Sequence, residues 1–121
     1  MNADYIREFN DTALYTDRAA IYRYKKTKHR DGSTTQSLKI IPKLKDIPCL
    51  LSIERSDEAV SNEEANEIRM IYTLLLSDLI ELKAGDHIRV TRKGKTYRFI
   101  AGLGIKYDFH QEIPLSFKEW A

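Results

Sequence analysis

The clearest pattern of apolar and polar positions along the chain lies in residues 83–102, KAGDHIRVTRKGKTYRFIAG. Apolar and polar side chains alternate on both sides of Lys93 and Gly94, and these two residues interrupt the alternation. The pattern predicts a tight β-hairpin with a two-residue turn at that point. In this register the pairs that face the core are Val90 with Tyr97 and Ile88 with Phe99.

The other face of the same predicted hairpin is polar and largely basic. It carries His87, Arg89, Thr91, Thr96 and Arg98. Arg89 lies opposite Arg98 in this register, and Arg92 lies opposite Lys95. Like charges paired across two strands cost roughly 0.2–1 kcal/mol per pair. A solvated surface tolerates that cost, whereas a surface that binds an acidic partner gives a reason for it. Arg89, Arg92, Lys95 and Arg98 are therefore candidate ring or partner contacts.

Shorter alternating segments extend the pattern over most of the chain. Further strands are predicted at residues 19–28, 34–43, 45–54, 67–76, 105–109 and 112–118. Asp31 and Gly32 supply a turn between the first two of these strands. The tip of that second hairpin is the most basic stretch of the chain, with Arg23, Lys25, Lys26, Lys28 and Arg30. A solvated tip and a charged contact surface are both compatible with this composition.

An acidic segment, residues 55–67, separates two apolar strands. Its carboxylates are Asp57, Glu58, Glu63, Glu64 and Glu67. Loops of this length inside a compact domain tend to be functional or disordered. The end of the segment allows two structures, because Ser61 and Glu64 have capping-box spacing for a helix over residues 61–76, whereas residues 67–76 also alternate as a strand. We favour the strand, with one helical turn before it as a further option.

Together these elements predict a mainly β protein. Closing a sheet hides its strand edges, so we expect a small antiparallel β-barrel of about six to eight strands that carries a long acidic loop. Residues 1–18 have weak helical periodicity and predict a short N-terminal helix, or an arm that becomes ordered on assembly. Residues 19–121 are then a single barrel domain.

The composition of the chain limits the classes of protein and the compartments that fit this domain. The chain has 121 residues, 42% of them hydrophobic, which is enough for a core without metals or disulfides. Its net charge of +2 is too small to identify a nucleic-acid binder. The lone Cys49 lies in an apolar run and is expected to be buried, which fits assembly in a reducing cytoplasm. We expect no membrane span and no export signal.

Candidate catalytic and metal-binding patterns are weak. His29, His87 and His110 fall on separate predicted turns and strands, without close spacing to cysteine or carboxylate ligands. The sequence has neither a glycine-rich phosphate loop nor a serine nucleophile elbow. Asp78 and Asp86 are expected to cap backbone N–H groups at turns. We therefore predict no enzymatic activity and no cofactor.

The order of these features resembles that of the head-closure family, the stopper or head-completion proteins in the neck of long-tailed bacteriophages. The residues that carry the match are Leu79, Lys83 to Asp86, Ile88, Arg92, Gly94 to Tyr97, Phe99 and His110 to Leu115. The match covers roughly residues 19–120. Each motif alone is common in small barrels, and the order and spacing give the resemblance its specificity.

The resemblance implies a virion protein that is assembled in the bacterial host cytoplasm and located at the head–tail interface. Six or twelve copies would form a ring between a portal-adaptor ring on the head side and a tail-terminator or tail-completion protein on the tail side. Double-stranded DNA would pass through its channel without sequence-specific contacts. By position, residues 55–67 would be the channel loop that retains packaged DNA, mobile in the free subunit and ordered in the ring. Its negative charge opposes DNA adhesion.

A nucleic-acid-binding barrel of the OB or SH3-like type is the alternative. In that interpretation the basic residues of the central hairpin contact phosphates, and Tyr22, Tyr24 or Tyr97 stack on bases. The predicted core position of Tyr97 and the nearly balanced total charge favour the neck protein. An adaptor of a cellular machine is a third option.

Overall fold

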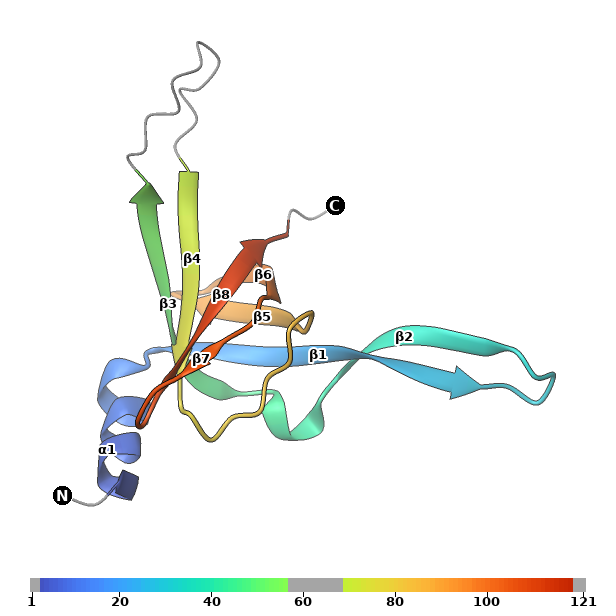
Figure 1. The fold of residues 1–121 in the computed structure, drawn as a ribbon, viewed down its shortest axis with the longest axis horizontal. Coiled ribbons are helices and arrows are strands. Elements are labelled where there is room, and N and C mark those ends of the chain that lie inside the picture. Colours follow the sequence, from blue (N-terminus) through green and yellow to red (C-terminus); the bar gives the residue numbers. More distant parts are fainter. Residues whose placement is uncertain (1–2, 57–68, 119–121) are drawn as a thin grey trace, which may run out of the picture.

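The computed structural model describes residues 3–56 and 69–118, and β-strands dominate it (Figure 1). The strands are β1 (Asp17–Lys28), β2 (Thr34–Ile40), β3 (Ile47–Ser56), β4 (Arg69–Leu76), β5 (His87–Arg92), β6 (Lys95–Ala101), β7 (Ile105–Lys106) and β8 (Gln111–Phe117). The helical elements are α1 (Ala3–Phe9), the π-helical turn η1 (Asn10–Leu14) and the 3-10 turn η2 (Pro42–Leu44). The mainly β class predicted from the sequence is confirmed.

Six of these strands close into an antiparallel barrel. The strands β1, β3, β4, β8, β6 and β5 are hydrogen-bonded in that order, and β5 pairs back with β1. Strand β2 extends the sheet from β1, and the short β7 pairs with β8. Closure leaves the six strands without open edges over their paired lengths. The predicted small antiparallel barrel is therefore confirmed.

The central hairpin forms in the predicted register. Val90 pairs with Tyr97 and Ile88 pairs with Phe99. Lys93 has a φ of 49° and Gly94 a φ of 79°, and positive values at both positions are what a two-residue type I′ turn requires. Ile88, Val90 and Phe99 are fully buried, and Tyr97 packs against the core at its edge.

Period-two alternation also explains the rest of the core. Each barrel strand sends alternate apolar side chains inward, because successive side chains of a strand point to opposite faces. Besides Ile88, Val90 and Phe99, the buried apolar residues of the strands are Ala19, Ile21, Ile47, Cys49, Leu51, Leu74, Leu76, Ala101, Ile113 and Leu115. Within the described residues, these side chains form one continuous hydrophobic core.

Two predicted strands end early. The strand expected over residues 105–109 is wrong beyond Lys106, because the Tyr107 N–H donates to the His110 carbonyl at 2.8 Å and Phe109 has a φ of 71°. These two features turn the chain back into β8. The strand expected over residues 34–43 ends at Ile40, since Pro42 begins η2.

Other boundaries differ by smaller amounts. Strand β1 begins at Asp17, two residues before the predicted start, and β4 confirms the preferred strand over the helix from Arg69 onward. The possible helical turn before it lies outside the described residues. Alternation along the strand predicted over residues 45–54 places Ile53 on the inward face with Cys49 and Leu51. This position is wrong for Ile53, which is 37% exposed, because β3 and β4 continue past the barrel as a two-stranded extension.

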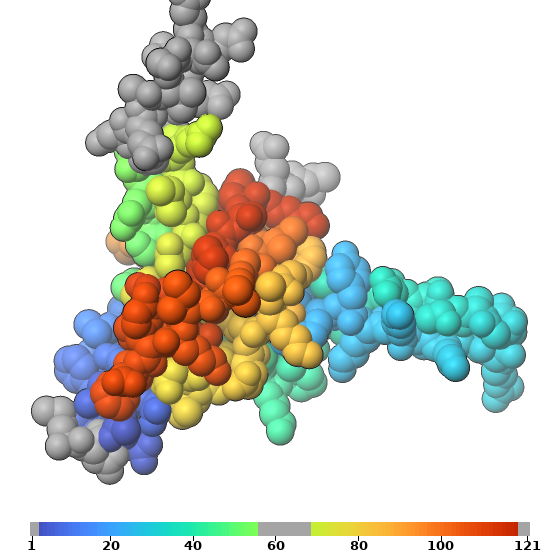
Figure 2. Space-filling model, in the orientation of Figure 1, coloured from blue at the N-terminus to red at the C-terminus, as the bar shows by residue number. Residues whose placement is uncertain are grey.

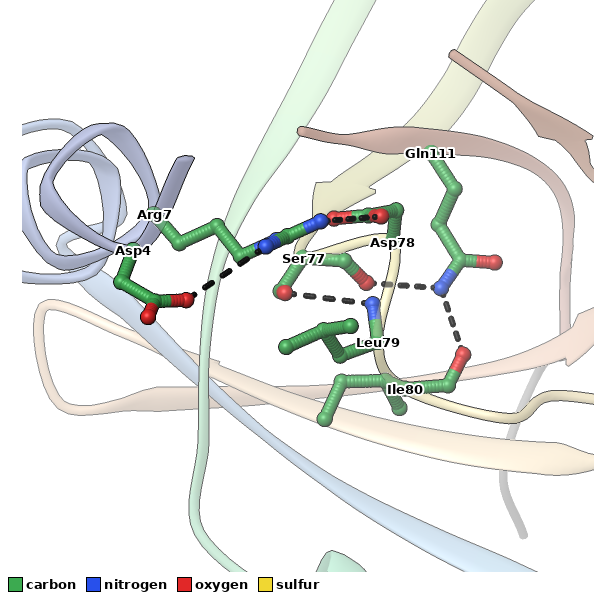
Figure 3. A network of polar contacts seen from close by, with 7 residues as sticks. All are labelled: Asp4, Arg7, Ser77, Asp78, Leu79, Ile80 and Gln111. Atoms are coloured by element: carbon green, nitrogen blue, oxygen red, sulfur yellow. Dashed lines mark hydrogen bonds and ion pairs between the residues drawn. The ribbon is translucent and has the colours of Figure 1, made fainter. Parts of the chain in front are cut away.

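The N-terminal segment is helical and packs against the barrel. Arg7 donates two hydrogen bonds to the Asp78 carboxylate, at 2.9 and 3.0 Å. Figure 3 shows the Arg7 guanidinium directed at this carboxylate. The turn that carries Asp78 is itself fixed by Gln111, whose amide donates to the carbonyls of Ser77 and Ile80. Of the two alternatives for residues 1–18, a short helix is the one observed.

Candidate partner-binding site

The outward face of β1, β5 and β6 brings two of the predicted contact residues together. Arg89 pairs with Arg98 across the central hairpin and with Ala20 across β1. The Arg89 guanidinium lies over the Tyr22 ring, 4.5 Å from its centroid. Such a cation–π contact contributes about 0.5–2 kcal/mol and holds the guanidinium plane in a fixed position. The predicted pairing of like charges is therefore real, and an aromatic ring orients one member of it.

A cavity of about 290 Å³ opens on this face. Its lining residues are Arg18, Ala19, Ala20, Tyr22, Lys45, Asp46, Arg89, Thr91 and Thr96. Asp46 is the one carboxylate among them, and its contact with Arg18 is long, 3.7 Å, and exposed to solvent. An ion pair of that kind contributes little to stability. The cavity thus has an excess of positive charge.

Arg89 is the residue best placed to bind a ligand in this cavity. Within the described parts of the chain its guanidinium has the Tyr22 ring as its contact and makes no hydrogen bond or ion pair. Partial burial lowers the pKa of the neighbouring Arg98, and the charge of Arg89 lowers it further. A carboxylate or phosphate in the cavity would relieve this repulsion, because a guanidinium binds such groups through two parallel N–H donors.

Arg92 and Lys95 lie apart from this pair. Arg92 is two residues beyond Val90 and faces the other way from Arg89. Its guanidinium donates to the Leu51 carbonyl at 3.1 Å and lies 3.9 Å from the Asp17 carboxylate. Lys95 pairs with Arg92 across the hairpin and is exposed. Of the four predicted contact residues, the structure therefore joins Arg89 and Arg98, and it gives Arg92 partners within its own subunit.

Asp17 is a buried polar residue that sequence reasoning missed. Its side chain is 3% exposed and accepts a hydrogen bond from the Leu51 N–H at 2.9 Å. The carboxylate thus joins the start of β1 to β3 and to Arg92. One signal could have revealed it, because Asp17 shares the period-two face of Ala19 and Ile21 and so points inward.

Asp86 anchors the base of the second hairpin. The carboxylate accepts a hydrogen bond from the Lys83 N–H at 2.8 Å, as expected for a turn residue. It also accepts two from Arg23, at 2.7 and 2.8 Å, which were not foreseen. The Asp86 side chain is 3% exposed and the Arg23 side chain is 33% exposed, so the carboxylate of this bidentate pair is withdrawn from water while the arginine remains partly solvated. Arg23 consequently belongs to the barrel and not to the basic tip.

Beyond Arg23 the β1–β2 hairpin leaves the barrel. Figures 1 and 2 show it extending well clear of the remaining strands. We call residues 24–38 the projecting hairpin. Tyr24 is 55% exposed and pairs with Leu38, which is 37% exposed. Tyr24 keeps one contact with the barrel, an edge-on ring contact with His87 at 5.5 Å. Past that contact, the described residues provide no third strand for the hairpin, and a two-stranded hairpin alone is marginally stable in water.

The predicted channel-loop residues lie outside the described residues. They are Asp57, Glu58, Glu63, Glu64 and Glu67. The described strands on either side, β3 and β4, stay paired up to Ser56 and Arg69. Met70 and Ile71 are 41% and 49% exposed, so this extension also carries apolar surface in contact with water.

Other chemistry is sparse in the described residues. Cys49 is fully buried, and burial raises the pKa of its thiol to about 12, so it is a packing residue and not a nucleophile. Within residues 3–56 and 69–118, no cluster of histidine, cysteine and carboxylate side chains could hold a metal ion. Across the same residues, no helix has the length and apolar character needed to span a membrane.

Comparison with known proteins gives one informative similarity. No protein-family model matches the sequence, and the curated proteins give no match either. Among solved structures, the fold is similar to that of protein xkdH of the phage-like element PBSX from Bacillus subtilis. The TM-score is 0.50 at 16% sequence identity, and the similarity covers 83% of this chain and 91% of that chain. The two proteins share a fold over most of their lengths.

Proposed function

We propose that this chain is a structural protein of a bacteriophage virion, and that in the virion it forms a ring in the neck between head and tail. The observation that carries the proposal is the shared fold, which extends over most of both chains and whose other member belongs to a phage-like element. The order of sequence motifs supports the same assignment independently, since the resemblance to head-closure proteins rests on residues spread over the whole barrel.

Exposed apolar surface supports assembly into an oligomer. Two strand pairs continue past the barrel, and both carry large apolar side chains in contact with water. Solitary exposed apolar residues are ordinary, but groups of them on projecting strands are typical of protein contacts. A ring of identical copies would cover such surfaces.

In this proposal the chain has three kinds of partner besides its own copies. A portal-adaptor ring lies on the head side, a tail-terminator or tail-completion protein lies on the tail side, and DNA passes through the channel. The cavity beside Arg89 receives a carboxylate of a neighbouring protein, where charge complementarity determines register and association rate. The acidic residues between β3 and β4 face the DNA, which they repel, and they help to close the channel after packaging. The ring has no enzymatic role and no cofactor.

Electron microscopy of particles tests the location directly. The chain is fused at its C-terminus to a compact fluorescent protein and supplied to a phage that lacks its own copy. We expect ring-shaped additional density at the head–tail junction of complete particles. A label on the capsid surface or along the tail tube, or its absence from particles, would reject the proposal.

One observation favours a second candidate, a nucleic-acid-binding barrel. Tyr22 and Tyr24 lie on the outward face of β1, on the same side of the sheet as Arg89 and Arg98. Aromatic rings beside guanidinium groups can bind single strands. In contrast, Tyr97 packs against the core and is unavailable for stacking. Titration of a labelled oligonucleotide decides between the two candidate functions. A phosphate-binding barrel loses affinity steeply as the salt concentration rises, whereas the neck protein should bind weakly at every salt concentration.

A further inference from the structure

The projecting hairpin has one face that combines apolar and basic side chains. Tyr24 and Lys26 share this face because they are two residues apart on β1, and their partners across the hairpin are Leu38 and Gln36. Residues 24–38 contain four basic side chains and one acidic side chain. The face therefore suits a partner that offers both apolar surface and carboxylates.

The N-terminal helix offers such a surface on its solvent side. Tyr5, Glu8, Phe9 and Thr12 follow one another at helical spacing and line a shallow groove of about 230 Å³. We call these four residues the helix stripe. Tyr5 is 61% exposed and Phe9 is 51% exposed. Residues 3–14 contain three acidic side chains and one basic side chain, so the stripe has apolar rings in an acidic setting.

These two surfaces are complementary but cannot meet within one molecule. Figure 1 shows α1 at one side of the barrel and the projecting hairpin extending from the opposite side, and the space-filling view in Figure 2 shows the same separation. The helix cannot move across, because the bidentate contact between Arg7 and Asp78 fixes it to the barrel. Arg7 also lies over the Phe109 ring, 5.7 Å from its centroid.

We propose that the projecting hairpin of one copy docks on the helix stripe of the next copy. Tyr24 and Leu38 would cover the rings of Tyr5 and Phe9, and basic side chains of the hairpin would lie beside Glu8. A contact between two different surfaces of the same chain is head-to-tail, and repetition of it generates a ring when the rotation closes. The inference rests on the proposed ring and specifies which surfaces build it.

Directed cross-linking tests the contact. The natural Cys49 is buried and unreactive, so single added cysteines report cleanly. One variant carries Thr12→Cys on the stripe and another carries Gln36→Cys on the hairpin, both at exposed positions. We expect a cross-linked dimer only when the two variants are mixed, and a ladder of oligomers when one chain carries both changes. A variant with Lys43→Cys, on the exposed η2 turn, is the control and should not cross-link with either.

Charge reversal then tests the specificity of the pairing. Glu8→Lys in the stripe variant should slow its cross-linking to the hairpin variant roughly three- to tenfold, because like charges across an interface lower the association rate. Lys26→Glu in the hairpin variant should restore the rate against the altered stripe. The matched reversal Lys43→Glu, at an exposed position outside both surfaces, should change nothing.

The outcomes separate this inference from the proposed function. Three outcomes would overturn the head-to-tail contact. The hairpin variant could form dimers alone, the Lys43→Cys control could cross-link equally well, or the mixture of stripe and hairpin variants could give no cross-link. The neck location could still stand, because labelled particles test it separately. Conversely, a ladder formed by a protein that never enters particles would support the contact and reject the neck role.

Discussion

The buried carboxylate of Asp17 provides a quantitative test of the fold. Asp17→Ala removes the acceptor of the Leu51 N–H and leaves that group unsatisfied in the core, which costs about 1–3 kcal/mol. It also removes the ion pair with Arg92, whose side chain is 37% exposed and 3.9 Å away, so we discount that term to about 0.5–1 kcal/mol. The expected loss of unfolding free energy is about 1.5–4 kcal/mol.

Urea denaturation followed by circular dichroism measures this loss. Asp17→Asn retains an acceptor oxygen and should lose less, about 1–2 kcal/mol, because a neutral hydrogen bond replaces a charged one. The slope of the unfolding free energy against urea concentration should be unchanged, since the surface exposed on unfolding is nearly the same. Asp46→Ala is the matched control, because that carboxylate is 78% exposed. If Asp17→Ala and Asp46→Ala were equally stable, the buried contact described here would be refuted.

The remaining predictions concern the core, pH and assembly. Phe99→Ala should cost about 3–5 kcal/mol in urea denaturation, because the ring is fully buried, whereas Leu103→Ala, at 82% exposure, should change stability by less than about 0.5 kcal/mol. The hydrogen bonds from Arg7 on α1 lower the pKa of Asp78 in the folded protein. This contact should therefore stabilise the fold fully above about pH 4, the pKa of an unfolded aspartate, and be lost as pH falls through the lower pKa of the folded state. Asp78→Asn should abolish this pH dependence of the unfolding free energy. Replacing Arg89 and Arg98 with Gln removes a like-charge repulsion of roughly 0.2–1 kcal/mol and also the contact with Tyr22, worth about 0.5–2 kcal/mol, so the two effects partly offset and the fold should be retained. Assembly onto the preceding ring should weaken, which co-sedimentation measures, and unimpaired assembly would leave the two arginines as solvated side chains.

The central hairpin shows how much of the fold the sequence contains. Alternation about Lys93 and Gly94 predicts its register correctly, because a slip of one residue would move every apolar side chain to the wrong face. The same reasoning predicts the inward positions of Cys49 and Leu51. It fails at Ile53, since alternation continues along a strand after the core has ended. Local patterns do not determine where a neighbouring strand stops covering a face.

Buried charge is the second feature that local patterns could not predict. Asp86 in a turn motif indicates capping, which is correct, but its partner Arg23 is 63 residues away in the sequence. Such a pair depends on the closure of the barrel. The cavity beside Arg89 has the same origin, because its lining comes from three strands and the turn before β3. The basic character of the hairpin could be predicted, and the Tyr22 ring beneath the guanidinium could not.

In the proposed function, this chain completes the neck of a phage particle. The most direct test is to delete its coding sequence from the phage genome and to measure nuclease-protected DNA in the particles that form, with the intact chain supplied in trans as the control. If the chain completes the neck, we expect separate heads and tails, with head DNA that nuclease digests unless the chain is supplied. Tailed particles with fully protected DNA in the absence of the chain would contradict it.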